Sequence, residues 1–231
     1  FLITAFYSAL SGLWGVLVTD FFQFILAMAG SVALAVFAVG AVGGLSGLRG
    51  ALDARYPDGG PLALFPDLHS AWMPPLTFFV YLAVNWWASW YPGAEPGGGG
   101  YIAQRLFSAR NERHALLAAL WFNLAHYALR PWPWILVALV SLLLYPGLPN
   151  PEEGYVRVMV DHLPPVWRGF LLAAFFAAYM STISTHLNWG ASYLLNDLYR
   201  RFIRPGASPR HYAAVARLAT LLLMVVAGVI T

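Results

Sequence analysis

The residues most suited to chemistry are polar side chains within the otherwise apolar stretch 170–195. One set is spaced by four, three, four and four residues, so its members share one helical face: Ser181, Thr185, Asn188, Ser192 and Asn196. Thr182 adds a hydroxyl beside Ser181, and Ala178 lies one turn earlier. Two hydroxyls and a carbonyl provide three oxygens, the ligand type that a small hard cation prefers. The alternative is that this face of small residues packs closely against another helix.

Asp20 is the only charged residue in the apolar stretch 13–42, where it follows Thr19 and precedes Gln23 by three positions. A carboxylate inside a membrane span is costly unless a partner, a proton or a cation neutralises it, so an ionisable residue there is a functional candidate. We therefore predict that Asp20 lies on an ion pathway. The alternative is that its carboxylate reaches toward the nearer membrane surface.

A third polar feature ends the apolar stretch 73–91. An asparagine and three tryptophans precede a segment rich in proline and glycine that continues to Gly100: Asn85, Trp86, Trp87 and Trp90. Aromatic rings and an amide at an interrupted helix suit a small polar solute, so Asn85 and Trp87 are positional candidates for solute contact. The alternative is a belt of aromatic residues at the membrane surface.

The composition of the whole chain indicates the medium in which these polar groups lie. Of 231 residues, 60% are hydrophobic and 10% are charged, whereas a soluble domain carries about 25% charged residues. The mean hydropathy is +0.63. So few charges cannot cover a soluble surface, and we predict an all-α integral membrane protein.

The sequence also disfavours several classes of function. It has no cysteine, which excludes disulfide frameworks, iron–sulfur clusters and thiolate zinc sites. Its six histidines are not spaced as metal ligands, and the hydroxyl stripe has no adjacent base to activate a nucleophile. The net charge of +3 is dispersed, unlike the clustered basic face that binds nucleic acid. We expect no enzymatic activity, no organic cofactor and no nucleic-acid partner.

Helices that position these polar groups must cross about 30 Å of hydrocarbon, which takes roughly 20 apolar residues each. We predict six membrane segments of a single domain: 1–10, 13–42, 73–91, 114–145, 170–196 and 213–231. Neighbouring prolines predict a kink in 114–145 near 130–133, and this stretch could be one kinked crossing, a surface helix followed by a crossing, or two crossings. Because the sequence begins and ends in apolar runs, we expect an interior piece of a longer protein.

The arginines decide between these alternatives. Seven of them fall in two short loops, one with Arg105, Arg110 and Arg113 and the other with Arg200, Arg201, Arg204 and Arg210. The positive-inside rule places both loops in the cytoplasm, so 114–145 crosses once and 170–196 crosses back. We expect a multi-pass protein of the bacterial cytoplasmic membrane.

Three groups of residues resemble motifs of the sodium:solute symporter family, in the family's order. They are the segment 11–23 with its Thr-Asp and Gln, the loop pair Gln104-Arg105, and 180–184 (Met-Ser-Thr-Ile-Ser) followed by 196–199 (Asn-Asp-Leu-Tyr). The resemblance implies the inverted-repeat, interrupted-helix fold shared with amino-acid transporters. In that frame the chain runs from the end of core helix 4 to core helix 9.

The resemblance also implies roles for individual residues. Ser181 and Thr182 supply hydroxyl ligands to sodium, Ala178 supplies a carbonyl, and Asp20 matches an acidic position along the sodium pathway. The implied function is symport of a small polar solute (a sugar, amino acid or carboxylate) by alternating access, with sodium as the coupling ion. The alternative is a solute-sensing domain of a larger membrane signalling protein. Arg130 and the insertion 91–100 depart from the sugar and proline members, so the resemblance does not identify the solute.

Overall fold

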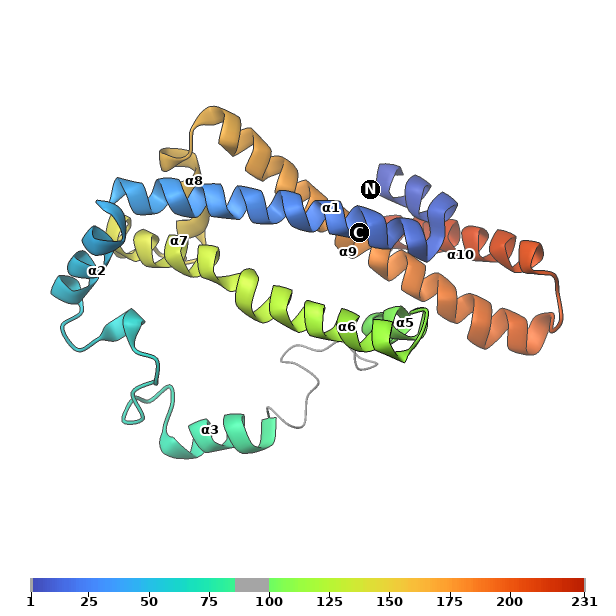
Figure 1. The fold of residues 1–231 in the computed structure, drawn as a ribbon, viewed down its shortest axis with the longest axis horizontal. Helices are drawn as coiled ribbons and strands as arrows, with labels where there is room; N and C mark the ends of the chain where they lie inside the picture. Colours follow the sequence, from blue (N-terminus) through green and yellow to red (C-terminus); the bar gives the residue numbers. More distant parts are fainter. Residues whose placement is uncertain (1, 86–99, 231) are drawn as a thin grey trace. The chain divides into compact units, whose positions relative to one another are not determined.

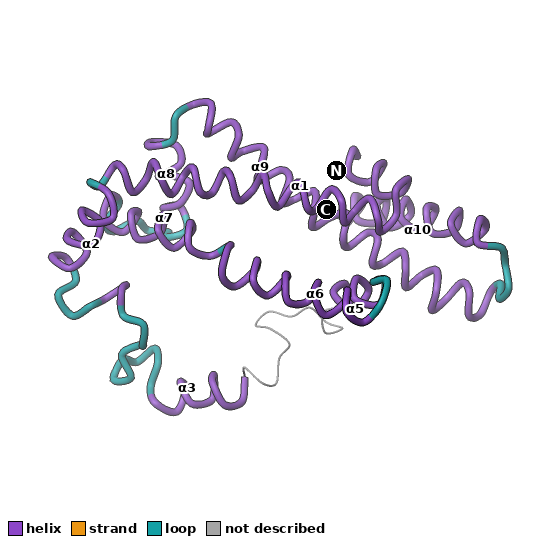
Figure 2. The backbone as a smooth tube through the Cα atoms, in the orientation of Figure 1, coloured by secondary structure: helices purple, strands orange, loops and turns teal. Residues whose placement is uncertain are grey.

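The computed structural model describes residues 2–85 and 100–230, and within them the chain forms helices joined by loops, without strands (Figures 1 and 2). The longer helices are α1 (Leu2–Ala41), α2 (Gly44–Arg55), α6 (Glu112–Asn123), α7 (Pro131–Leu144), α8 (Glu153–His162), α9 (Pro165–Tyr193) and α10 (Pro209–Ile230). The shorter ones are η1 (Gly60–Leu62), α3 (Pro75–Val80) and α5 (Gly100–Phe107), and three π-helical segments are η2 (Tyr81–Asn85), η3 (Leu124–Leu129) and η4 (Leu194–Ile203).

Four helical stretches in the described residues are long and apolar enough to cross a membrane: Gly12–Ala41, Glu112–Leu144, Pro165–Ile203 and Pro209–Ile230. The prediction of an all-α, multi-pass membrane protein is therefore confirmed. A shorter apolar helix covers Pro75–Val84. The number of six membrane segments and the inverted repeat stay predictions.

Two local irregularities of the backbone interrupt these long helices. Gly12 has φ 61 and ψ −158 inside α1, a combination of positive φ and extended ψ that is essentially confined to glycine because it has no Cβ. The second irregularity is the π-helical segment η3 before α7, where the Arg130 amide donates to the Ala125 carbonyl at 3.0 Å, five residues earlier. Pro131 then begins α7, a position where its missing N–H breaks no helical hydrogen bond.

The described chain divides into two compact units, and each is considered by itself. The first contains Phe1–Phe37 and Val158–Thr231, so it includes most of α1 together with α9, η4 and α10. The second is Ala38–Arg157. In the second unit α2 packs against α7 and buries Leu48, Leu52, Val137 and Val140.

Glycines allow close approach between the helices of the first unit. A Cβ added at Gly30 of α1 would lie 2.8 Å from Leu171 Cδ1 and 3.5 Å from Leu171 Cα. Near the other end of α9, a Cβ at Gly190 would lie 2.9 Å from Leu223 Cδ1 of α10. Small residues at such contacts are the usual means by which membrane helices pack.

The contact at Gly30 yields a stability prediction. Gly30→Val in the full-length protein inserts a side chain against buried Leu171, and we expect a loss of about 1–3 kcal/mol of stability. Gly40→Val is the matched control in the same helix, because a Cβ at Gly40 meets nothing within 4 Å. Thermal unfolding in detergent measures both, and equal losses in the two variants would contradict the packing assignment.

Candidate functional site

The central contact of the site joins α1 to α9 within the first unit. The Ser181 hydroxyl of α9 donates a hydrogen bond to Asp20 Oδ1 of α1 at 2.7 Å, between residues 161 positions apart in the sequence. Both side chains are partly buried. The structure therefore brings together the predicted pathway carboxylate and one predicted sodium ligand.

The Gly30 contact gives the relative direction of the two helices. From Asp20 to Gly30 the sequence advances ten residues, while the partner on α9 moves back ten, from Ser181 to Leu171. The two helices therefore run antiparallel here. This is the relative direction that the arginine-based orientation requires of the stretches 13–42 and 170–196.

The other two predicted sodium residues lie on adjacent turns of α9. Thr182 Oγ1 donates to the Ala178 carbonyl at 3.1 Å, and both residues are exposed. Their two oxygens are thus close enough to contact one cation. The Thr182 hydroxyl keeps its two lone pairs because it acts here as the donor. The Ala178 carbonyl accepts this hydroxyl in addition to the helical N–H four residues later, so a cation would have to displace one of the two.

Ser181 differs from the neighbouring hydroxyls of its helix. Ser184 donates to the Ser181 carbonyl at 3.0 Å, and Ser192 donates to the Trp189 carbonyl at 2.7 Å. Hydroxyls in helices commonly bond to carbonyls three or four residues earlier in this way. Ser181 instead donates to a charged group on another helix, which singles it out from the stripe of which it is a part.

Two further polar residues border the site that the sequence analysis did not assign to it. His186 Nδ1 lies 2.8 Å from the Thr182 carbonyl oxygen, which requires a proton on Nδ1. Gln23 Oε1, one turn after Asp20 on α1, is buried and has no hydrogen-bond partner in the described part of the chain. Helical spacing could have indicated both residues, because Gln23 follows Asp20 by three positions and His186 follows Thr182 by four.

The candidate solute residues are less well placed. Asn85 is the last residue of η2, and Trp87 lies outside the described residues. Both stay positional predictions.

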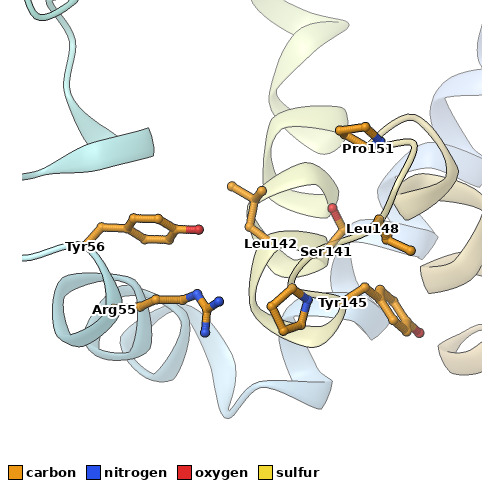
Figure 3. A pocket seen from close by; sticks show the side chains of 9 residues that line it. Arg55, Tyr56, Ser141, Leu142, Tyr145, Leu148 and Pro151 are labelled. Carbon is orange, nitrogen blue, oxygen red and sulfur yellow. The ribbon is translucent and has the colours of Figure 1, made fainter.

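A small cavity in the second unit contains none of the predicted site residues (Figure 3). Its volume is about 130 Å³, and it lies between the end of α2 and the end of α7. Arg55 and Tyr56 project into it from one side, with Leu142 and Ser141 opposite. The guanidinium carbon of Arg55 lies 5.9 Å from the Tyr56 ring centre, so this cation already has an aromatic partner.

Comparison with known proteins connects this geometry to one family. The sequence model of the sodium:solute symporter family matches residues 1–231. The sodium/mannose cotransporter SLC5A10 of Bos taurus is 27% identical over 96% of this chain and 41% of its own length. The sodium/glucose cotransporter 4 of Danio rerio is 26% identical, covering 96% of this chain and 37% of the relative. The high-affinity proline transporter PutP of Bacillus subtilis is 37% identical over 36% of this chain and 18% of its own length.

The Asp20–Ser181 bond yields a testable coupling. We expect the stability losses of Asp20→Ala and Ser181→Ala, each of which removes one partner of the bond, to be non-additive by about 1.5–3 kcal/mol, the range for hydrogen bonds to charged groups. The measurement is a double-mutant cycle on thermal unfolding of the full-length protein. The control cycle pairs Asp20→Ala with Ser192→Ala, whose hydroxyl bonds within α9. Additive losses in the first cycle would show that the two side chains do not interact.

Proposed function

The chain belongs to the sodium:solute symporter family, and from that premise we propose that it forms part of a sodium-coupled symporter for a small polar organic solute. The chain spans only about two fifths of the sodium/mannose cotransporter, so the proposal concerns the whole protein of which these helices are a part. We place that protein in the bacterial cytoplasmic membrane. The solute classes are a sugar, an amino acid or a carboxylate.

The hydrogen bond from Ser181 to Asp20 is the observation that carries this proposal. A serine hydroxyl donates one hydrogen bond and retains two lone pairs. Because Asp20 accepts that hydrogen at 2.7 Å, the lone pairs of Ser181 stay available to a cation. The carboxylate has a second effect, since its negative charge attracts a cation in a medium where charges are poorly screened.

Three oxygens of α9 make up the proposed sodium site: the hydroxyls of Ser181 and Thr182 and the carbonyl of Ala178. Oxygen ligands suit a hard cation, and the remaining ligands come from an interrupted helix elsewhere in the whole protein. Gln23 Oε1, which has no hydrogen-bond partner among the described residues, is an additional acceptor one turn from Asp20. The Asp20 carboxylate accepts a hydrogen bond from Ser181 and is not one of the three ligand oxygens. We therefore assign it to the path by which sodium reaches or leaves the site.

The sodium gradient supplies the driving force for solute accumulation. At about 100 mV the membrane potential contributes ~2.3 kcal/mol for each sodium ion that enters. Sodium and solute bind from one side of the membrane and are released to the other by alternating access. The site on α9 then couples the two movements because it is complete only when the helices around it close on the ion.

Removing a ligand tests the sodium site. Ser181→Ala and Thr182→Ala in the full-length protein should each raise the sodium concentration for half-maximal uptake by about tenfold or more, because each loses an oxygen worth about 1.5 kcal/mol or more. The measurement is sodium-dependent uptake of labelled solute into proteoliposomes. Ser192→Ala is the control, and its sodium dependence should match the unsubstituted protein. Unchanged sodium dependence in both ligand variants would refute the site.

Asp20 is tested separately because it acts along the pathway. Asp20→Asn keeps the shape of the side chain and removes its charge, so we expect slower sodium-driven uptake with the solute KM little changed. The time course of uptake at saturating solute measures this. Normal uptake kinetics at every sodium concentration would exclude a pathway role for the carboxylate.

The positional candidates for solute contact give a different signature. Asn85→Ala and Trp87→Ala should raise the solute KM while the sodium dependence at saturating solute stays as in the unsubstituted protein. Uptake of a sugar, an amino acid and a carboxylate identifies the solute for this test. A pair of variants with an unaltered solute KM would remove both residues from the solute site.

A further inference from the structure

The turn between η4 and α10 carries an excess of positive charge that no described side chain neutralises. Its four arginines are exposed and form no ion pair within residues 2–85 and 100–230: Arg200, Arg201, Arg204 and Arg210. Asp197 is the only acidic residue between positions 194 and 230. The charge of this turn is therefore complementary to an anionic partner.

Tyr212 of α10 holds the turn in one conformation. Its hydroxyl donates to the Arg204 carbonyl at 2.8 Å and accepts from the Ala207 amide at 3.0 Å. The guanidinium carbon of Arg200 lies 5.4 Å from the centre of the Tyr212 ring, within the range of a cation–π contact. A second contact, 2.9 Å between Tyr199 Oη and His211 Nε2, joins η4 to α10. Tyr212 thus contacts two arginines, Arg200 through its ring and Arg204 through the backbone carbonyl.

The position of the turn along the helices places it at a membrane surface. The apolar stretch Pro165–Ile203 ends immediately before it, and Pro209–Ile230 begins immediately after it. Residues 204–208 are too few to extend far from the bilayer, and an irregular turn cannot lie exposed in the hydrocarbon. Figure 1 shows this turn at the far end of the α9–α10 pair, where the orange and red ribbons meet.

Apolar side chains beside the arginines also favour a position of this turn at the membrane surface. Leu198, Phe202 and Ile203 of η4 are exposed, although they alternate with arginines in the sequence. An amphipathic segment of this kind lies in the interface, with its apolar side chains toward the acyl chains and its basic side chains at the level of the headgroups.

We propose that Arg200 and Arg204, held by Tyr212 and flanked by Arg201 and Arg210, bind the phosphate groups of anionic phospholipids in the cytoplasmic leaflet. A guanidinium matches phosphate geometry through paired N–H donors. The positive-inside rule accounts for the positive charge of these residues. It does not predict that the inserted protein prefers one lipid headgroup to another. A selective, saturable lipid site is thus a separate property, independent of which solute the protein carries.

Lipid titration of the detergent-solubilised full-length protein tests this site. Native mass spectrometry would count bound phosphatidylglycerol and phosphatidylcholine, and we expect the unsubstituted protein to prefer phosphatidylglycerol. Each arginine near an anionic membrane surface contributes about a fivefold gain in affinity. The double variant R200Q/R204Q should therefore bind phosphatidylglycerol roughly 30-fold more weakly, with phosphatidylcholine binding unchanged.

The matched control is R110Q/R113Q, which removes two arginines from the other basic loop and should keep the preference. Arg204→Gln and Tyr212→Phe serve as milder variants, and each should weaken phosphatidylglycerol binding while the protein remains folded. Equal lipid binding by R200Q/R204Q and the unsubstituted protein would overturn the proposal. So would displacement of phosphatidylglycerol by an equal concentration of inorganic phosphate, which would identify a simple anion site.

Discussion

A carboxylate among apolar helices must find a hydrogen-bond donor, and that requirement governs how α1 and α9 meet. Asp20 obtains its donor from Ser181 at 2.7 Å, and the loss of such a partner would leave a partly buried charge uncompensated. Gly30 makes the approach possible at the other end of the contact, since a Cβ there would overlap Leu171. Polar pairing and glycine packing therefore fix one relative placement of the two helices.

The same requirement distinguishes the hydroxyl of Ser181 from the other hydroxyls of α9. Thr182, Ser184 and Ser192 satisfy their hydrogens on carbonyls of α9 itself, so their bonds would exist in the isolated helix. The bond of Ser181 exists only when α1 is in place. A change in the distance between α1 and α9 thus alters the electrostatics at Ser181 directly, and this is the property that an ion site coupled to helix movement needs.

Local patterns in the sequence were sufficient for the membrane class and for the proximity of Ala178, Ser181 and Thr182, because both depend on composition and on the helical period alone. The pairing of Asp20 with Ser181 was not predictable, since spacing within one helix does not identify a partner 161 positions away. His186 was missed because histidines were considered only as metal ligands. The π-helical segment before Pro131 was hidden for a different reason: the prolines indicate a break but not how the backbone accommodates it.

The charged residues of the first unit differ in where their partners come from. Within the apolar stretch, the Asp20 carboxylate accepts a hydrogen bond from Ser181, a partner that the hydrocarbon of a membrane cannot supply. At the end of η4 the arginines have no protein partner of opposite charge among the described residues, and the headgroup region can supply one. Ser181 and Arg200 are 19 residues apart on one continuous helical stretch, which is about 28 Å at the helical rise. Coulomb coupling over that distance is largely screened at the membrane surface, so the proposed sodium site and the proposed lipid site of this unit are physically separable.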